Sequence, residues 1–358
     1  MAGALLRLRL LATGLLLALA VPALSVPPDW PGALPSAPSE RLEAWFLGNT
    51  TLLFRAGDQA ILIDGFLSRP TMDEFVFRRL ASDQGLVERC LAAAGVWMGA
   101  RPDGASLQGV LVAHGHYDHA LDAVHVARLT GARVGGAPST LAVLPRPAGV
   151  EVHEFRDPAP EEFGRFTVRA FRFPHSLPNL FWGGVRRPVE QPAHVLAFRD
   201  RGSSAFHITI DGFRILVHPS AGYIPGGYGD LRADVVFLSV GGLGARGPRF
   251  ARRYWQEVVG GRGARLVIPV HWDRINRPLR RGFAFQATSD RPFPVMAALM
   301  DMARAERARR SGRTPAGDEQ APALRLMPFF APVDLRGASA ALPEGEPLSL
   351  AAPGCALS

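Results

Sequence analysis

Three histidines and one aspartate lie close together in residues 114–119, whose sequence is HGHYDH. The apolar run 110–113 before them is typical of a buried strand, and the apolar positions after them predict a helix. Neutral imidazole and carboxylate groups are preferred ligands of Zn²⁺ and related divalent ions. A chance match to this spacing is expected in about one such chain in a thousand. We therefore interpret the segment as a metal site rather than as a polar turn with solvated histidines.

Strands and helices must position these side chains, and the chain alternates between the two patterns. Apolar runs bounded by turn residues predict strands at 44–47, 51–54, 60–64, 110–113, 132–135, 166–173, 193–199, 205–210, 213–218, 235–240 and 266–270. Asp211-Gly212 is a strong hairpin signal between two of these strands. Helical periodicity covers 75–94, 249–259 and 294–310. These patterns alone indicate an α/β or α+β protein.

The HGHYDH segment resembles the His-x-His-x-Asp-His signature of the metallo-β-lactamase-fold hydrolase superfamily. Gly48-Asn49, the Phe-Pro-His at 173–175 and the His-Trp-Asp at 271–273 look most like the branch that includes sugar-phosphate lactonases and N-acyl-phospholipid phosphodiesterases. The resemblance covers residues 42–335. It implies a four-layer αββα sandwich with the metal site at the strand edges.

The resemblance also implies a centre for one or two divalent ions, with zinc as the first candidate and other transition metals as alternatives. His175 follows strand 166–173 and His271 follows strand 266–270, so both stand where the family has ligands. The implied ligands are His114, His116 and His175 for one ion, and Asp118, His119 and His271 for the other. Asp64 and Asp273 are expected to support the ligands through hydrogen bonds, although ordinary turn aspartates would give the same pattern.

One position departs from the family pattern. Ser220 stands where the family usually has an aspartate that bridges the two metals. A hydroxyl is a poor ligand for a divalent ion, so either His218 takes over or the site holds only one ion firmly. His218 is a candidate because it faces the same side of an extended chain as Ser220. Tyr117 is a further candidate, as a hydroxyl directed at substrate.

The implied chemistry is hydrolysis, in which bound metal lowers the pKa of water and the resulting hydroxide attacks the substrate. The resemblance assigns Asp118 and His116 as the catalytic residues, and with a single ion Asp118 would act as general base. An ester or lactone is the first substrate class. A phosphodiester of a phospholipid-like or other anionic molecule is the second. The competing hypothesis is a secreted, non-catalytic metal- or ligand-binding protein with the same fold.

Composition narrows the alternatives. The chain has 358 residues, 47% of them hydrophobic and 20% charged, which is ordinary for a globular protein. It contains no lysine, so all 40 basic residues are arginines, and Schiff-base chemistry is excluded. The net charge is +8, which mildly favours an anionic substrate. The arginines are scattered, so no nucleic-acid partner is expected. Cys90 and Cys355 cannot form a disulfide framework, and a single bridge between them is possible but unsupported. Cys90 is interpreted as a core residue.

The two ends are expected to lie outside the folded domain. Residues 1–24 contain a basic head and an apolar core, which predict a signal peptide, transient membrane contact and export to the periplasm or medium. An uncleaved signal would instead tether the protein to the membrane. Residues 25–40 are interpreted as a proline-rich tether, and 336–358 as a disordered tail. The domain spans 41–335, with 71–105 as an insertion near the mouth of the site.

Overall fold

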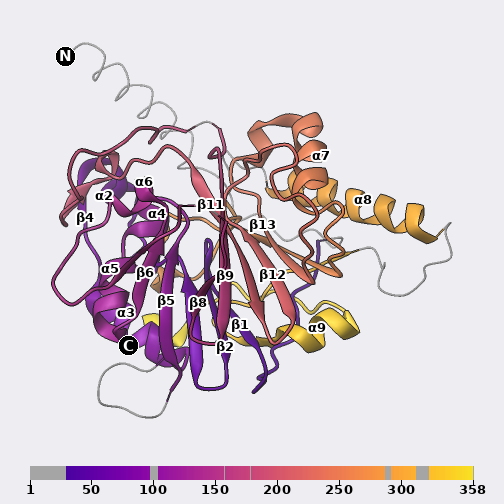
Figure 1. Ribbon diagram of the computed structural model, residues 1–358, viewed down its shortest axis with the longest axis horizontal. Coiled ribbons are helices and arrows are strands. Elements are labelled where there is room, and N and C mark those ends of the chain that lie inside the picture. The colour runs from indigo at the N-terminus through magenta and orange to yellow at the C-terminus, as the bar shows by residue number, and fades with distance from the viewer. Residues whose placement is uncertain are drawn as a thin grey trace.

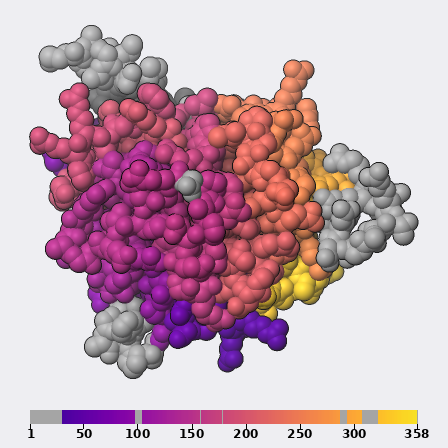
Figure 2. Space-filling model, viewed as in Figure 1, coloured from indigo at the N-terminus to yellow at the C-terminus, as the bar shows by residue number. Residues whose placement is uncertain are grey.

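The computed structural model describes residues 30–96, 104–156, 158–177, 179–286, 292–311 and 322–357. Two large sheets lie face to face in the middle of the molecule, and helices cover their outer faces (Figure 1). In the space-filling view from the same side, the first half of the chain occupies the left and centre, and later segments occupy the right (Figure 2). Among the described residues, no helix is long and apolar enough to cross a membrane.

The first sheet has the strand order β16-β1-β2-β3-β5-β6-β7. Its members are β1 (Glu43–Gly48), β2 (Thr51–Ala56), β3 (Gln59–Ile63), β5 (Ser106–Val112), β6 (Arg133–Gly136), β7 (Val152–Glu154) and β16 (Pro332–Asp334). Strands β1 to β3 form an antiparallel meander, whereas β3, β5, β6 and β7 run parallel. Parallel neighbours need long crossover connections, and helices on the outer face supply them here.

The second sheet has the order β15-β14-β13-β12-β11-β9-β8. Its members are β8 (Glu161–Phe163), β9 (Phe166–Phe173), β11 (Ser203–Ile210), β12 (Phe213–His218), β13 (Val235–Ser239), β14 (Leu266–Val270) and β15 (Ala323–Leu324). The predicted hairpin is present, because Asp211 and Gly212 adopt φ values of 44° and 75° between β11 and β12. In β9, buried residues alternate with more exposed ones, as one-sided packing of a strand requires.

The core lies between the sheets and continues under the outer helices. Phe54 of the first sheet meets Phe237 of the second edge to face, with ring centroids 5.4 Å apart. Helices α3 (Gln84–Ala93) and α5 (Ala123–Thr130) bury apolar side chains against the first sheet. Helices α7 (Gly247–Val258) and α8 (Pro292–Ser311) cover the second. This is the αββα sandwich that the resemblance implied.

Two predicted elements are wrong in detail. The single helix expected over 75–94 is two helices, α2 (Met72–Phe77) and α3, separated by the short strand β4 (Arg79–Leu80). The break occurs because β4 pairs with β10 (Ala193–His194), which satisfies its backbone groups outside a helix. The strand expected over 193–199 is therefore only two residues long, and a 3₁₀ helix, η1 (Val195–Ala197), follows it.

The N-terminal tether prediction is wrong for the part of that segment that the structure describes. Trp30 packs edge to face against Phe285 and Phe293, and Ala33 and Leu34 are buried. Burial of these apolar side chains holds the proline-rich segment on the domain. The predicted signal peptide at 1–24 lies outside the described residues.

The C-terminal residues are also part of the domain, so the prediction of a disordered tail is wrong. Helix α9 (Leu335–Ala341) follows β16, which pairs with β1. The chain then runs to the 3₁₀ helix η4 (Gly354–Ala356), and its end lies beside α3 (Figure 1). Buried Leu335, Ala338 and Cys355 anchor this segment.

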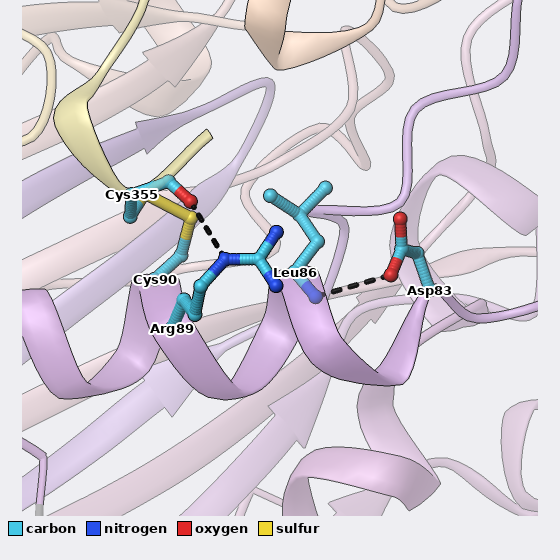
Figure 3. The surroundings of a disulfide bond; sticks show 5 residues. All are labelled: Asp83, Leu86, Arg89, Cys90 and Cys355. Carbon is cyan, nitrogen blue, oxygen red and sulfur yellow. Dashed lines mark hydrogen bonds between the residues drawn. A yellow bond between two sulfur atoms is a disulfide. The ribbon is translucent and has the colours of Figure 1, made fainter. Parts of the chain in front are cut away.

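A disulfide joins Cys90 of α3 to Cys355, a bridge that the sequence left possible but did not support. Cys90 is also buried in the core, as its apolar surroundings predicted. The Cα atoms are 5.0 Å apart, and the two cysteines are separated by 265 residues in the sequence. Figure 3 shows Arg89 of the same helix donating to the Cys355 carbonyl at 3.2 Å, and Asp83 capping the helix at the Leu86 amide. The end of the chain is therefore fixed to the helical layer outside the first sheet.

Candidate metal centre

Six side chains form two groups of potential metal ligands. Within each group, one ligand atom per residue lies within 4.8 Å of the others. The groups are His114, His116 and His175, and Asp118, His119 and His271. The rings of His114 and His119 have centroids only 3.8 Å apart, so the groups adjoin. The structure thus brings together all six residues that the resemblance assigned as ligands, in the same two sets of three.

Three segments carry these residues. The HGHYDH segment connects the end of β5 to the short helix α4 (Tyr117–Ala120), with His116 at the N-cap. His175 follows β9, and His271 follows β14 with a φ of 60°. A positive φ is uncommon for a non-glycine residue. It is held here by a hydrogen bond from the His271 amide to the Asn49 carbonyl at 2.7 Å.

The donor atoms fit a metal. Among the described residues, His114 and His116 each have a buried Nε2 atom without a hydrogen-bond partner. Buried polar atoms are nearly always paired, so these two imidazole nitrogens fit a bound metal ion. His175 stands over the first two rings, with ring centroids 4.6 Å and 4.5 Å away. Three imidazoles in one group, and two imidazoles with a carboxylate in the other, are donor sets suited to zinc and similar ions.

Electrostatics prepare the first group to bind a cation. Burial is the largest cause that lowers the pKa of His114, His116 and His175, and repulsion from neighbouring imidazoles adds to it. For His175 the pKa falls to about 4. These rings are therefore neutral near pH 7, and a neutral ring nitrogen has the lone pair that a metal needs.

The second group contains the one carboxylate. Asp118 Oδ2 lies 3.4 Å from His119 Nε2 and 3.3 Å from His271 Nε2. Burial opposes ionisation of Asp118, but these two histidines outweigh it and hold the carboxyl pKa well below its usual range. Burial likewise opposes the charged form of His119, but Asp64 and Asp118 outweigh it and raise the pKa of His119 to about 10. Binding of a cation at His119 Nε2 would therefore release a proton.

Asp64 orients His119. Its Oδ2 lies 2.7 Å from His119 Nδ1 and accepts from the Thr50 hydroxyl at 2.5 Å. Its Oδ1 accepts from the Ala113 amide at 2.8 Å. Because His119 Nδ1 is directed at Asp64, Nε2 is the nitrogen that faces the centre. Asp64 thus makes the kind of supporting hydrogen bond that the sequence suggested.

Replacing Asp64 by Asn should weaken zinc binding about 10- to 100-fold, the usual effect of losing such a partner. The amide can turn its NH₂ group toward His119 Nδ1, which removes the acceptor that keeps the metal-facing nitrogen deprotonated. Zinc affinity is measured by competition with a chromophoric chelator. Asp211→Asn is the matched control, because Asp64 and Asp211 both have a positive φ, 57° and 44°. Equal affinities for the two variants would contradict this role of Asp64.

Asp273 acts at one remove from the ligands. It is fully buried, and it accepts from the Asn49 amide at 2.8 Å and from Arg69 Nη1 at 2.6 Å. Asn49 binds the His271 amide through its carbonyl, and its Nδ2 donates to the Asp118 carbonyl at 2.6 Å. Asp273 therefore fixes the Gly48-Asn49 turn, which in turn holds the backbone of two ligand-bearing segments.

His218 belongs to neither group, although the sequence made it a candidate to replace the bridging aspartate as a ligand. Its Nε2 donates to the Gly222 carbonyl at 2.7 Å, and its Nδ1 therefore accepts from the Tyr228 hydroxyl at 2.5 Å. The ring also stacks on Phe173, with centroids 4.1 Å apart. With both nitrogens engaged, His218 is a structural residue of the second sheet.

Ser220 and Tyr117 also have other partners. The Ser220 hydroxyl accepts from the Ser176 amide at 3.1 Å, so it holds the loop that follows His175. Tyr117 is 2% exposed, and its hydroxyl accepts from Asn276 Nδ2 at 3.4 Å. The ring packs against Phe66 and Phe75. Tyr117 is thus buried in an aromatic cluster beside the centre and does not present its hydroxyl to the site.

Burial lowers the pKa of His218 to about 3, below the value of about 6.5 for an exposed histidine. Between these two pKa values, His218 is protonated in the unfolded chain and neutral in the folded one. Its contribution to the free energy of unfolding is therefore complete above pH 6.5 and is lost as the pH falls. We expect a loss of about 2 kcal/mol between pH 6.5 and pH 5 from this residue. Urea denaturation at pH 7 and pH 5 should show a smaller difference for His218→Gln than for the wild type. His153→Gln, on β7, is the control, and an unchanged difference in His218→Gln would overturn the prediction.

The structure also shows supporting residues that the sequence analysis missed. Asp200 accepts from the Gly115 amide and from the Thr140 hydroxyl, both at 2.8 Å, and so fixes the HGHYDH loop. Gly241 leaves room for the ring of His271, since a Cβ at this position would lie 2.5 Å from His271 Nδ1. No local pattern marks either residue, because each is brought to the centre from a distant part of the chain.

Comparison with known proteins agrees with this geometry. A sequence profile described as the beta-lactamase superfamily domain matches residues 85–272, more than half of the chain. No curated protein sequence matches the chain significantly. The chain is a member of the metallo-β-lactamase-fold superfamily of metal-dependent hydrolases.

Several solved structures are similar to it at low sequence identity. The metallo hydrolase Igni18 from the archaeon Ignicoccus hospitalis is 14% identical, with a TM-score of 0.48 over 82% of this chain and 97% of that one. Unliganded yeast PDE1 is 11% identical, with a TM-score of 0.45 over 82% and 99%. The metallo-β-lactamase-fold protein YhfI from Bacillus subtilis is 15% identical, with a TM-score of 0.41 over 64% and 85%.

Proposed function

We propose that the protein is a metal-dependent hydrolase that cleaves an ester or lactone bond. The observation that carries the proposal is the pair of adjoining ligand groups with unpaired, buried imidazole nitrogens. Divalent ions bound there, with zinc as the first candidate, would lower the pKa of a water toward neutrality and stabilise negative charge on the substrate oxygen. Histidines 114, 116 and 175 would hold one ion, and Asp118 with histidines 119 and 271 the other.

Asp118 is the residue that would handle the proton. It is the one carboxylate among the six side chains, and it is ionised near neutral pH for the reasons given above. An ionised carboxylate beside the attacking water can orient it and accept its proton. Because Ser220 leaves the family's bridging position without a carboxylate, Asp118 would have to do this alone. The neutral histidines of the first group fix the geometry rather than move protons.

The alternative substrate is a phosphodiester, whose phosphorus would be attacked in the same way. The arginine-rich surface favours it, because an anionic substrate is attracted by a net charge of +8. We also propose that the protein is exported. The apolar N-terminal segment supports export, and so does the Cys90–Cys355 disulfide, because such bonds persist mainly in oxidising compartments.

The test combines metal analysis with turnover on the full-length protein. Metal content per chain is measured, and hydrolysis of an ester, a lactone and a bis-aryl phosphodiester is assayed before and after chelation. Two ions with chelator-sensitive ester or lactone turnover support the proposal as stated, and turnover of the phosphodiester alone supports the alternative. One ion with turnover would make Asp118 the general base of a mononuclear enzyme. Bound metal without turnover on any substrate would favour a non-catalytic binding protein, and no bound metal would refute the hydrolase.

A further inference from the structure

A cavity of about 340 Å³ lies between α2 and the segment 274–281. Its walls come from the loop that follows His271 and from α2, which lies on the same side of the molecule as α4 in Figure 1. The loop contributes three arginines, Arg274, Arg277 and Arg281, and we call this cavity the arginine pocket. None of the proposed metal ligands lines it.

The arginine pocket has three positively charged side chains in its lining. Arg277 donates two hydrogen bonds to backbone carbonyls, from Nε to Gly282 at 3.0 Å and from Nη2 to Arg281. In the part of the chain that the structure describes, the guanidinium groups of Arg274 and Arg281 have no hydrogen-bond or ion-pair partner. The one acidic residue of the lining, Asp73, accepts from the Thr71 hydroxyl and projects into solvent.

The three guanidinium groups repel one another. Burial lowers the pKa of Arg277, and the charges of Arg274 and Arg281 lower it further. Like charges gathered in a partly buried cavity raise the energy of the free protein, and an anion that bridges them lowers it. The electrostatics therefore favour an anionic ligand.

The pocket also has an apolar wall. Met72 and Phe77 of α2 line it, and Phe77 is 75% exposed, the highest value among the large hydrophobic residues described as exposed. An exposed aromatic ring beside a charged cavity loses unfavourable contact with water when an apolar group covers it. The lining thus suits a ligand with an anionic group attached to an apolar body.

A short chain of contacts links the pocket to the metal centre. Asn276 lines the pocket and donates to the hydroxyl of Tyr117, which stands between His116 and Asp118 in the sequence. Arg274 is three residues from His271, and its carbonyl accepts from Arg69 Nη1 at 3.4 Å. These contacts connect the lining of the pocket to the two segments that carry His116, Asp118 and His271.

We propose that the arginine pocket binds the anionic group of an amphiphilic substrate, a phosphate or carboxylate joined to an apolar body, and so positions its scissile bond at the metal centre. This assignment deepens the proposed function and, in its catalytic part, rests on it. The same chemistry is presented by a soluble alkyl phosphate and by the headgroup of an anionic lipid.

Binding is tested first on the full-length protein stripped of metal, so that the result does not depend on turnover. Isothermal titration calorimetry compares hexyl phosphate, inorganic phosphate and hexanol. We expect hexyl phosphate to bind more tightly than either of the others, and the double variant Arg274→Gln/Arg281→Gln to weaken its binding at least tenfold. Arg304→Gln, an exposed position on α8, is the control for loss of one positive charge. Equal binding by the double variant and the control would overturn the assignment.

Kinetics then test the positioning role on the metal-loaded protein. Two ester substrates are compared that differ only in a carboxylate. For the anionic ester, KM of the double variant should be at least tenfold higher than that of the wild type. For the neutral ester, the two proteins should have the same KM. A protein without turnover in either form would refute the hydrolase, while the calorimetric result on the pocket would still stand. Competition of phosphatidylglycerol vesicles, but not phosphatidylcholine vesicles, with hexyl phosphate identifies a lipid headgroup as the source of the anion. Its absence identifies a soluble ligand.

Discussion

The variant His116→Ala should lose about one metal ion per chain and at least about a thousandfold in turnover. The His116 ring packs against both other rings of the first group, with centroids 4.5 Å from those of His114 and His175. Its removal leaves two imidazoles, which is fewer than a zinc site needs. Metal-assisted stabilisation of the transition state is worth several kcal/mol, and each 1.36 kcal/mol is a factor of ten in rate. Metal analysis and turnover are measured on the same preparation.

His153→Ala is the matched control for this variant, since His153 is a half-buried histidine of β7 that belongs to neither ligand group. It should keep the metal content and turnover of the wild type. Thermal unfolding distinguishes loss of the site from loss of the fold, because apo protein and His116→Ala should then melt alike. A His116→Ala protein with full metal content would mean that the ion sits elsewhere. Full turnover with reduced metal would place the chemistry on the second group alone.

The ligand set could be predicted from the sequence because each ligand follows a recognisable strand. HGHYDH, His175 and His271 all come directly after an apolar run, and strand ends meet at one edge of a sandwich. His218 satisfied the same criterion at the end of β12, yet it is not in the site. The difference lies in its neighbours, since Tyr228 and the Gly222 carbonyl engage both ring nitrogens. Such partners come from tertiary packing, which spacing in the sequence does not encode.

The fold was predictable where periodicity is strong and less so where contacts are distant. The break between α2 and α3 depends on pairing with β10, more than a hundred residues later. The C-terminal segment looked disordered because it is rich in alanine, proline and glycine. Its order comes from the backbone pairing of Glu346 with Ala33 and from the covalent bond to α3. Composition predicts whether an isolated segment is ordered, whereas both of these contacts require the rest of the domain.

Loss of the Cys90–Cys355 disulfide should destabilise the protein by about 5 kcal/mol. The bond closes a loop of 265 residues, and the loss of chain entropy in the unfolded state grows with the length of the closed loop. The unfolded chain is a flexible polymer, and closing its loop restricts the conformations that it can adopt. A typical domain is stable by only about 5–15 kcal/mol, so the change is a large fraction of the total. Urea denaturation of the oxidised wild type and of Cys90→Ala/Cys355→Ala measures it.

Reduction of the wild type is the second measurement, because it breaks the bond without changing a side chain. The reduced wild type and the double variant should lose stability by similar amounts, while the metal content of both stays at the oxidised level. That separation is expected because Cys90 and Cys355 join the layer outside the first sheet, and neither they nor Arg89, which donates to Cys355, contacts a proposed ligand in the described residues. A loss below about 1 kcal/mol would show that packing of α9 and β16 alone holds the C-terminal segment.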